Sequence, residues 1–357
     1  MDSIYPYRVA WQAPKAVSVS PESRRAILTA LEYEYPTSRR RLAEKTSLGD
    51  ATFRRGLRQL MREKIIALKY GQDPDSGRPV DLITFESYPI LPVLELSETC
   101  LIWRLCSTDG RSVFATVRDR GGFCTAEDDL YTLMGQVSSI LQAGTCRIPK
   151  DVPLQPPVLL LPSPADSLSI PHAHTLPNHP DRLNALVHRV LDEAPLCTLT
   201  AEEAVAHELY HHPAAGNSSC VLHVYLGAVN TATLFVREIA SDTQSPLIPA
   251  PYAGEMTRAL QEMLEGTVPR STLWSSRIAE FLSTACRFIT PQLVVIEASD
   301  TFPVSDGLQD HLPSHTTLLR LPYALNTPAL AHRGALRFSR RALWERLSGK
   351  PLESTHE

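Results

Sequence analysis

The chain has 357 residues, with 35 Lys and Arg against 39 Asp and Glu, so its formal net charge is −4. Its 43% hydrophobic and 21% charged content is typical of a globular protein with two or three cores. No run of about 18 apolar residues predicts a membrane span, and the first twenty residues lack the apolar core of a secretion signal. Seven cysteines without a CxxC pair favour reduced thiols over a disulfide frame or a zinc knuckle. We therefore expect a cytoplasmic protein without a membrane partner, a metal or a cofactor.

Residues 1–19 show no periodicity and are expected to form an N-terminal arm. A helix start follows at Ser20-Pro21-Glu22, where a capping residue precedes a proline and an acid. Ile27, Leu28 and Leu31 then form the inner stripe of that helix, which has to end before Pro36.

The stretch from Ser38 to Phe85 predicts helix, tight turn, helix and a two-stranded wing. Leu42 and Ala43 face inward from the first of these helices, and Leu48 fills the turn. The second helix has an inner stripe at helical spacing, made by Phe53, Leu57, Leu60 and Met61. Its other face is polar and basic, and consists of Thr52, Arg54, Arg55, Arg58 and Arg62.

Two short runs after the second helix predict the strands of the wing. Residues 65–70 alternate in the pattern of a strand, residues 80–84 give a second strand, and Gly71 to Pro79 has turn chemistry throughout. Arg78 is expected near the tip of the wing, within reach of a phosphate or the minor groove.

Charge is distributed unevenly along the chain. Residues 15–78 hold fourteen Lys and Arg against eight Asp and Glu, a net of +6, and residues 1–14 are neutral, so residues 79–357 carry −10. This asymmetry and the arginine face predict a double-stranded DNA operator as the partner of the first segment. The predicted DNA-binding residues are Ser38, Arg39, Asp50, Thr52, Arg54, Arg55, Arg58 and Arg78. A homodimer is expected, because one such domain makes only a small contact.

The rest of the chain predicts an α/β domain in which one plan occurs twice. Strand patterns at residues 90–106 and 112–117, a helix at 128–143 and a buried strand at 158–161 form the first unit. The second has strand patterns at 219–226 and 232–239, helices at 254–264 and 272–288, and buried strands at 293–296 and 317–321. A β-β-β-α-β order that occurs twice indicates two related lobes facing a cleft.

In the order of its motifs, the chain resembles the ROK family of sugar kinases and sugar-responsive repressors. The likeness spans nearly the whole chain and involves Gly77-Arg78-Pro79 after the winged helix, Leu94 to Arg104, Thr200 to Glu208, His223 to Gly227, Pro291 to Ser299, and Gly334-Ala335. The resemblance implies an actin-like pair of lobes behind a winged helix-turn-helix. The domains then expected are an arm at 1–19, the winged helix at 20–86, lobe 1 at 90–198, lobe 2 at 199–327, and a C-terminal helix at 328–357 packing back on lobe 1.

The departures from the family pattern argue against kinase activity. Glu98 lies in the turn that holds ATP phosphates in the kinases, where a carboxylate replaces glycine and opposes a polyphosphate. Thr200 stands where the kinases have their catalytic aspartate, and a hydroxyl cannot serve as that general base near neutral pH. Three further motifs of the family have no counterpart here. The glycine-rich second phosphate turn is replaced by Val229 to Thr233, and the glycines beside adenosine by Glu297 to Ser299. The zinc-binding cysteines are absent from the sequence between Val229 and Gly266.

We therefore expect a transcriptional regulator, most simply a repressor, with no catalytic residues and a non-catalytic ROK-like domain. An effector cleft would be lined by Glu98, Thr200, Glu202 and Asn230, and the effector is sugar-like by analogy only. Two alternatives stay open: a degenerate actin-fold sugar kinase, and a regulator whose second domain only dimerises.

Two groups of histidines are candidates for a metal site. His207 and His211 have the i, i+4 spacing of a metal pair but lack the HExxH motif and precede Pro213, which favours a solvated helix end. His172, His174 and His179 form a second, loose group in a proline-rich loop, where a weak metal or effector contact is the less favoured interpretation.

Overall fold

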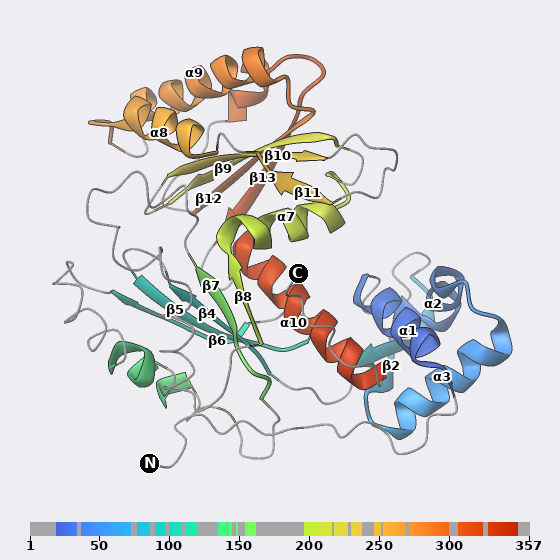
Figure 1. Cartoon of the computed structure of the whole chain (residues 1–357). Helices are drawn as coiled ribbons and strands as arrows, with labels where there is room; N and C mark the ends of the chain where they lie inside the picture. The colour runs from blue at the N-terminus through green and yellow to red at the C-terminus, as the bar shows by residue number, and fades with distance from the viewer. Residues whose placement is uncertain are drawn as a thin grey trace.

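The computed structural model describes most of the chain, namely residues 19–33, 37–72, 77–85, 90–96, 100–108, 112–119, 135–140, 142–144, 148, 154–161, 196–215, 218–227, 230–237, 246–250, 253–268, 271–299, 306–323 and 328–348. A small helical domain lies beside two α/β lobes, one above the other in the view of Figure 1. None of the described helices is long and apolar enough to cross a bilayer.

The N-terminal part forms the predicted winged helix-turn-helix. Its elements are α1 (Pro21–Tyr33), β1 (Thr37–Ser38), α2 (Arg39–Thr46), α3 (Asp50–Arg62), β2 (Ile66–Gln72) and β3 (Pro79–Phe85). The strands pair antiparallel in the order β1-β3-β2, so that β1 adds a third strand to the expected wing. The sharp turn after α2 is made by Ser47, which has a left-handed backbone with φ of 51°.

The inner stripes of this domain follow the sequence pattern, with one correction. Ile27, Leu28, Leu31, Phe53 and Leu60 are buried, as predicted. Met61, expected inside, is 36% exposed. The buried neighbour is instead Gln59, whose amide donates to Glu63. A polar residue on the inner stripe is tolerated here because it has a hydrogen-bond partner.

Lobe 1 is a five-stranded sheet. Its strands are β4 (Leu91–Leu96), β5 (Cys100–Cys106), β6 (Ser112–Asp119), β7 (Val158–Leu161) and β8 (Cys197–Thr200), in the spatial order β6-β5-β4-β7-β8. Of the helix expected at 128–143, residues 135–140 and 142–144 are helical, and the others lie outside the described residues. Val137 and Ile140 of this helix pack into one core with Leu94, Trp103 and Leu159 of the sheet.

Lobe 2 repeats this plan. Its elements are α7 (Ala201–His211), β9 (Cys220–Leu226), β10 (Thr231–Arg237), β11 (Leu247–Pro249), α8 (Ala253–Leu264), α9 (Thr272–Ile289), β12 (Leu293–Ser299), the 3-10 helix η2 (Asp306–His311) and β13 (Thr317–Tyr323). The strand order is β11-β10-β9-β12-β13. In both sheets the first three strands are antiparallel and the last two join in parallel, so the expected internal repeat is confirmed.

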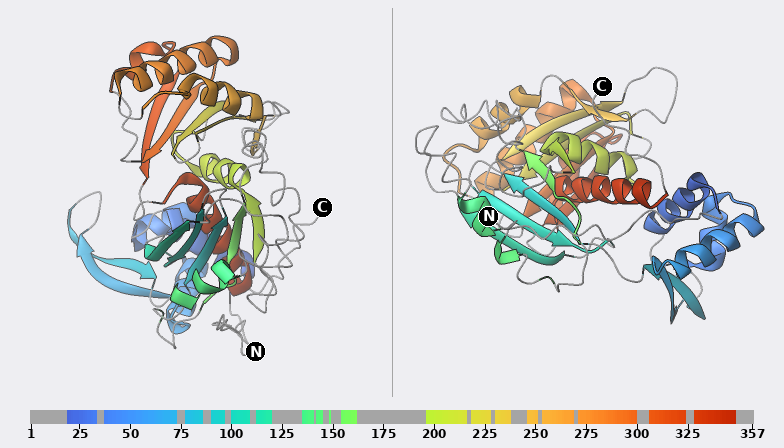
Figure 2. Two further views of the ribbon diagram at one scale, coloured as in Figure 1. Left: turned by 90° about the vertical axis from the view of Figure 1, so that its left-hand side faces the viewer. Right: turned by 60° about the horizontal axis from the view of Figure 1, so that its bottom comes forward.

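The chain closes with α10 (Leu330–Ser348), which lies along α7 and also contacts α1, β4 and β7 (Figures 1 and 2). One core cluster accordingly runs from α1 and α3 through β4 and β7 to Leu336, Leu343 and Trp344 of α10. The winged helix therefore shares buried apolar surface with lobe 1 through this helix.

The close crossing of α7 and α10 depends on Gly334. A Cβ atom built there would collide with the backbone oxygen of Ala204, and backbone cannot move aside as a flexible side chain can. We expect Gly334→Ala to lower the free energy of unfolding by about 1–3 kcal/mol, the range for overpacking. At an unhindered position inside a helix, the same Gly→Ala change would instead raise the free energy of unfolding by up to about 1 kcal/mol. Urea unfolding, with Gly135→Ala as the control, checks this, since a Cβ at Gly135 meets nothing within 4 Å. Equal stability of Gly334→Ala and the wild type would contradict the packing argument.

Candidate nucleic-acid interface and interlobe region

The second helix of the motif, α3, presents a basic face to solvent. Arg54, Arg55, Arg58 and Arg62 are all exposed, and Thr52 is half-buried. The opposite face of the helix is buried by Phe53, Leu57 and Leu60. An amphipathic helix of this kind can enter the major groove without disturbing its own core.

Two of these arginines have partners within the helix. Arg54 Nε donates to Asp50 Oδ1 at 2.7 Å, and Arg58 Nε approaches the Arg54 carbonyl oxygen at 3.4 Å. Asp50 thus stabilises the first turn of α3, by accepting from Arg54 and by placing a negative charge at the positive end of the helix dipole. Within the described part of the chain nothing pairs with Arg55 or Arg62, so both guanidinium groups are candidates for a contact to DNA.

The remaining predicted contacts lie around α3. Arg39, in the first turn of α2, and Arg78, beside the wing, are exposed. Ser38 is buried and is the N-cap of α2, with its hydroxyl accepting from the backbone N–H of Arg41 at 3.4 Å. In this structure Ser38 therefore shapes the start of α2.

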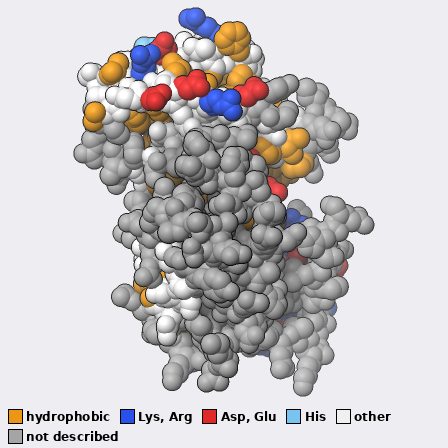
Figure 3. All heavy atoms as spheres, turned by 60° about the vertical axis from the view of Figure 1, so that its left-hand side comes forward, with side chains coloured by type: hydrophobic (Ala, Val, Ile, Leu, Met, Phe, Trp, Pro, Cys, Tyr) orange, Lys and Arg blue, Asp and Glu red, His pale blue; other side chains and the backbone are white. Residues whose placement is uncertain are grey.

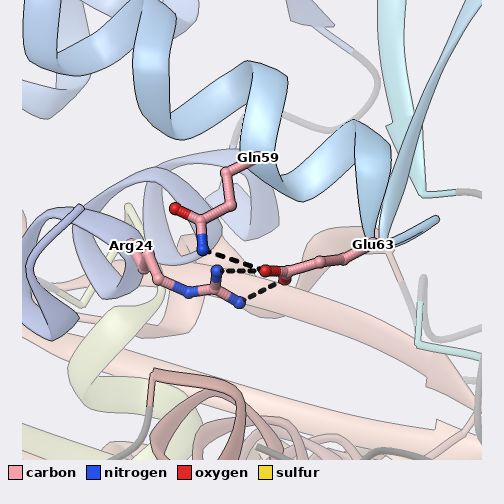
Figure 4. Close-up of polar contacts among 3 residues, drawn as sticks. All are labelled: Arg24, Gln59 and Glu63. Carbon is pink, nitrogen blue, oxygen red and sulfur yellow. Dashed lines mark hydrogen bonds and ion pairs between the residues drawn. The ribbon is translucent and has the colours of Figure 1, made fainter. Parts of the chain in front are cut away.

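An ion pair between the buried Arg24 of α1 and the half-buried Glu63 at the end of α3 was not predicted from the sequence. Both terminal nitrogens of Arg24 donate to Glu63, at 2.8 and 2.6 Å, and Gln59 Nε2 donates to Glu63 Oε1 at 3.0 Å (Figure 4). The Arg24 side chain is completely buried. Bidentate pairing fixes both direction and distance, so the network holds the end of α3 against α1. The available signal was that Arg24 lies on the same helical stripe as Ile27, Leu28 and Leu31.

The predicted effector-cleft residues have structural partners. Thr200 is the N-cap of α7 in a capping box, accepting from Glu203 N at 3.1 Å while Glu203 Oε2 accepts from Thr200 N at 2.7 Å. Glu202 Oε1 lies 3.5 Å from the hydroxyl of Thr233 on β10. Glu98 lies outside the described residues.

Asn230 closes the hairpin between β9 and β10. Its side-chain oxygen accepts from Gly227 N at 3.2 Å, and its carbonyl accepts from Gln261 Nε2 at 3.0 Å. A Cβ at Gly227 would collide with Tyr225 and Tyr323, whose rings stack with their centroids 5.0 Å apart. Burial, together with the neighbouring Tyr323 and Glu95, raises the pKa of Tyr225. The side chains of Asn230, Tyr225 and Tyr323 thus lie against the turn between β9 and β10. A turn that holds a phosphate would need its backbone N–H groups free of such neighbours.

Two buried histidines contact acidic residues, one pair within lobe 2 and the other between α10 and lobe 1. His223 of β9 has its Nε2 3.1 Å from Glu297 Oε2 of β12. His332 of α10 has its Nδ1 3.0 Å from Glu95 Oε2 of β4. Burial and the nearby Arg104 lower the pKa of His332 to about 3, so its ring is neutral at neutral pH.

The expectation of a solvated helix end at His207 is wrong. His207 packs against Phe338 of α10 with ring centroids 4.3 Å apart and meets His211 edge-on at 5.1 Å. Burial is the main cause that lowers the pKa of His207 to about 3, followed by His211 and Arg337. No group of three or more metal-ligating side chains occurs among the described residues. The pair therefore belongs to the packing of α7 on α10.

Comparison with known proteins finds similarity in structure. No model of a protein family matches the sequence, and no curated protein is recognisably similar to it. A solved ROK family transcriptional regulator, described as a homologue of the E. coli MLC protein, superposes with a TM-score of 0.53 at 12% identity, over 92% of this chain and 99% of that one. An inorganic polyphosphate/ATP-glucomannokinase from Arthrobacter sp. strain KM gives a TM-score of 0.44 at 13% identity, over 70% of this chain and 98% of that one. A ROK family glucokinase from Streptomyces griseus gives 0.42 at 8% identity, over 70% of this chain and 97% of that one. With its winged helix-turn-helix and two related α/β lobes, this chain has the fold of the ROK family.

Proposed function

We propose that this protein is a DNA-binding transcriptional repressor whose two-lobed domain dimerises the chain and responds to a small molecule without catalysing phosphoryl transfer. The observation that carries the proposal is the exposed arginine face of α3 on a helix whose other face is buried. The regulator that superposes over 92% of the chain supports the same assignment. A homodimer would present two copies of α3 to two half-sites of an operator, about 10 bp or a multiple of it apart.

The mixed charge on the surface of lobe 2 supports the proposal that DNA contacts the winged helix and not this lobe. Around α8 and α9, acidic, basic and apolar side chains are interspersed on the face seen in Figure 3. Arg277 and Glu280, for example, pair at 3.3 Å on α9. A surface of mixed charge does not attract a polyanion as the face of α3 does.

The geometry between the lobes supports a non-catalytic second domain. The hydroxyl of Thr200, at the position of the expected base, already caps α7, and the side chain of Asn230 occupies the backbone N–H of Gly227. A positioned proton acceptor and open backbone N–H groups for the phosphates both contribute to sugar phosphorylation by ATP. A degenerate kinase is the alternative function, and a nucleotide assay separates the two.

The DNA-binding proposal predicts a specific loss on removing Arg55. Arg55→Ala should weaken binding to a duplex that the full chain has selected from a random pool, by about 1–3 kcal/mol, which is about 5- to 150-fold at fixed salt. Fluorescence anisotropy measures the affinity. Arg277→Ala, which removes an exposed arginine from α9, is the matched control and should bind as the wild type does. Wild-type affinity in both Arg55→Ala and Arg58→Ala would reject α3 as the reading helix.

The second prediction concerns nucleotide. Calorimetry of the purified protein with ATP and magnesium should give no binding isotherm, and a panel of sugars should give no ATP turnover. Loss of a positioned base alone typically removes about 10²–10⁴ in rate. The Glu98→Gly/Thr200→Asp variant provides the comparison. Stoichiometric ATP binding, or sugar-dependent turnover above that variant, would favour the degenerate kinase.

A further inference from the structure

The first turn of α10 is held by a carboxylate from lobe 2. Glu297 of β12 is 1% exposed, and its Oε1 accepts from the backbone N–H of Leu330 at 2.7 Å. Its other oxygen faces His223 Nε2 at 3.1 Å. A carboxylate is favourable at a helix N-terminus because the first N–H groups have no partner within the helix. Lobe 2 therefore supplies the cap of a helix that packs on lobe 1.

The same turn is held from the other side by lobe 1. His332, two residues after Leu330, has its Nδ1 3.0 Å from Glu95 Oε2 of β4. The other ring nitrogen, Nε2, is buried and has no partner among the described residues. An unpaired buried polar atom is unfavourable, so a small displacement that gave it a partner would be favoured. Any change in the separation of β4 and β12 must move this turn or break one of its two contacts.

The opposite end of α10 is held by the winged helix. Trp344 stacks on Phe85, the last residue of β3, with ring centroids 5.3 Å apart and an interplanar angle of 21°. Glu345 pairs with Arg25 of α1 at 3.4 Å. Figure 1 shows α10 running from the region beside α7 to the helices of the N-terminal domain. The two sets of contacts are separated by most of a helix of 19 residues, about 28 Å long at 1.5 Å per residue.

The middle of α10 is packed too closely to absorb a displacement. Arg337 Nε donates to Glu208 of α7 at 2.9 Å, and Gly334 lies directly against the backbone of Ala204. Leu336 and Leu343 are buried in the core shared with α1 and β4. A helix held in this way moves as one body, since close-packed interiors transmit strain.

We propose that α10 couples the relative position of the two lobes to the orientation of the winged helix, and so to operator affinity. The part of this inference that concerns operator affinity rests on the proposed function, because it requires that the protein binds DNA. A small molecule that draws the lobes together or apart would shift Glu297 against Glu95, move the first turn of α10 and displace Phe85 through Trp344. By linkage, operator binding changes the affinity for that molecule by the same factor.

The test compares one change at the lobe end of α10 in two backgrounds. Glu297→Ala removes the cap, and Glu297→Gln, which keeps an acceptor without the charge, replaces it if Glu297→Ala does not fold. Each is made in the wild type and in Arg25→Ala/Trp344→Leu, where the contacts to the winged helix are lost. Affinity is measured with the full chain on the selected duplex. We expect a three- to tenfold weakening in the wild-type background and less than a 1.5-fold change in the other.

A matched control separates coupling from loss of stability. Thr257→Ala removes a buried hydroxyl of α8 that bonds both backbone groups of Ala232, at 3.1 Å each, without touching α10. It should leave operator affinity unchanged. An equal effect of the Glu297 change in both backgrounds, or no effect in either, would overturn the proposal.

A second readout does not depend on DNA. Hydrogen exchange should speed up in residues 21–33 and 79–85 of the Glu297 variant and stay at the wild-type rate in Thr257→Ala. If the wild type binds no duplex, the proposed function fails. The hydrogen-exchange rates of residues 21–33 and 79–85 then decide whether α10 couples the lobes to the winged helix. Unchanged exchange in those residues of the Glu297 variant would then overturn it.

Discussion

The packing of α7 against α10 is the constraint on which the rest of the structure depends. The two helices meet at Gly334, where any side chain would strike the backbone of Ala204. Around this contact, Arg337 pairs with Glu208 and His207 packs on Phe338. Because α10 also contacts β4, β7 and α1, its position relates both lobes to the winged helix.

Within the winged helix, one buried ion pair sets the geometry of the reading helix. Arg24 and Glu63 form two hydrogen bonds, and Gln59 satisfies the same carboxylate. Such a pair contributes little net stability when complete, but the loss of Glu63 would leave the completely buried charge of Arg24 without its partner. The pair thus serves to fix how α3 lies on α1, and so the direction in which its exposed arginines point.

The periodic elements could be predicted from the sequence, because burial on one face leaves a regular pattern. The stripe of Phe53, Leu57 and Leu60 and the buried strand at 293–296 were predicted for this reason and are confirmed. Two short strands were not predicted. β8 and β11 are four and three residues long and only one residue of each is buried, whereas β7, also four residues long, is buried throughout and was predicted.

The candidate sites were predictable only in part, because partners distant in the sequence decide which polar residues are buried. His207 was expected to be solvated and Gln59 was not among the predicted inner residues, yet each makes contacts that only the folded chain brings together. Thr200 and Asn230 were singled out by alignment of motifs, and their hydrogen bonds show what they do locally. The Glu297 contact to Leu330, across 33 residues of chain, has no local signal at all.

The central claim is that the arginine face of α3 contacts the phosphates and bases of DNA, and the salt dependence of binding tests it most directly. The affinity of the full chain for its selected duplex should fall linearly with the logarithm of salt concentration. With about five to seven phosphates neutralised by each winged helix, the slope should be about −4.5 to −6 per winged helix, and about −9 to −13 for the proposed dimer on two half-sites. A slope near zero, or binding that does not distinguish the selected duplex from random DNA, would contradict the account.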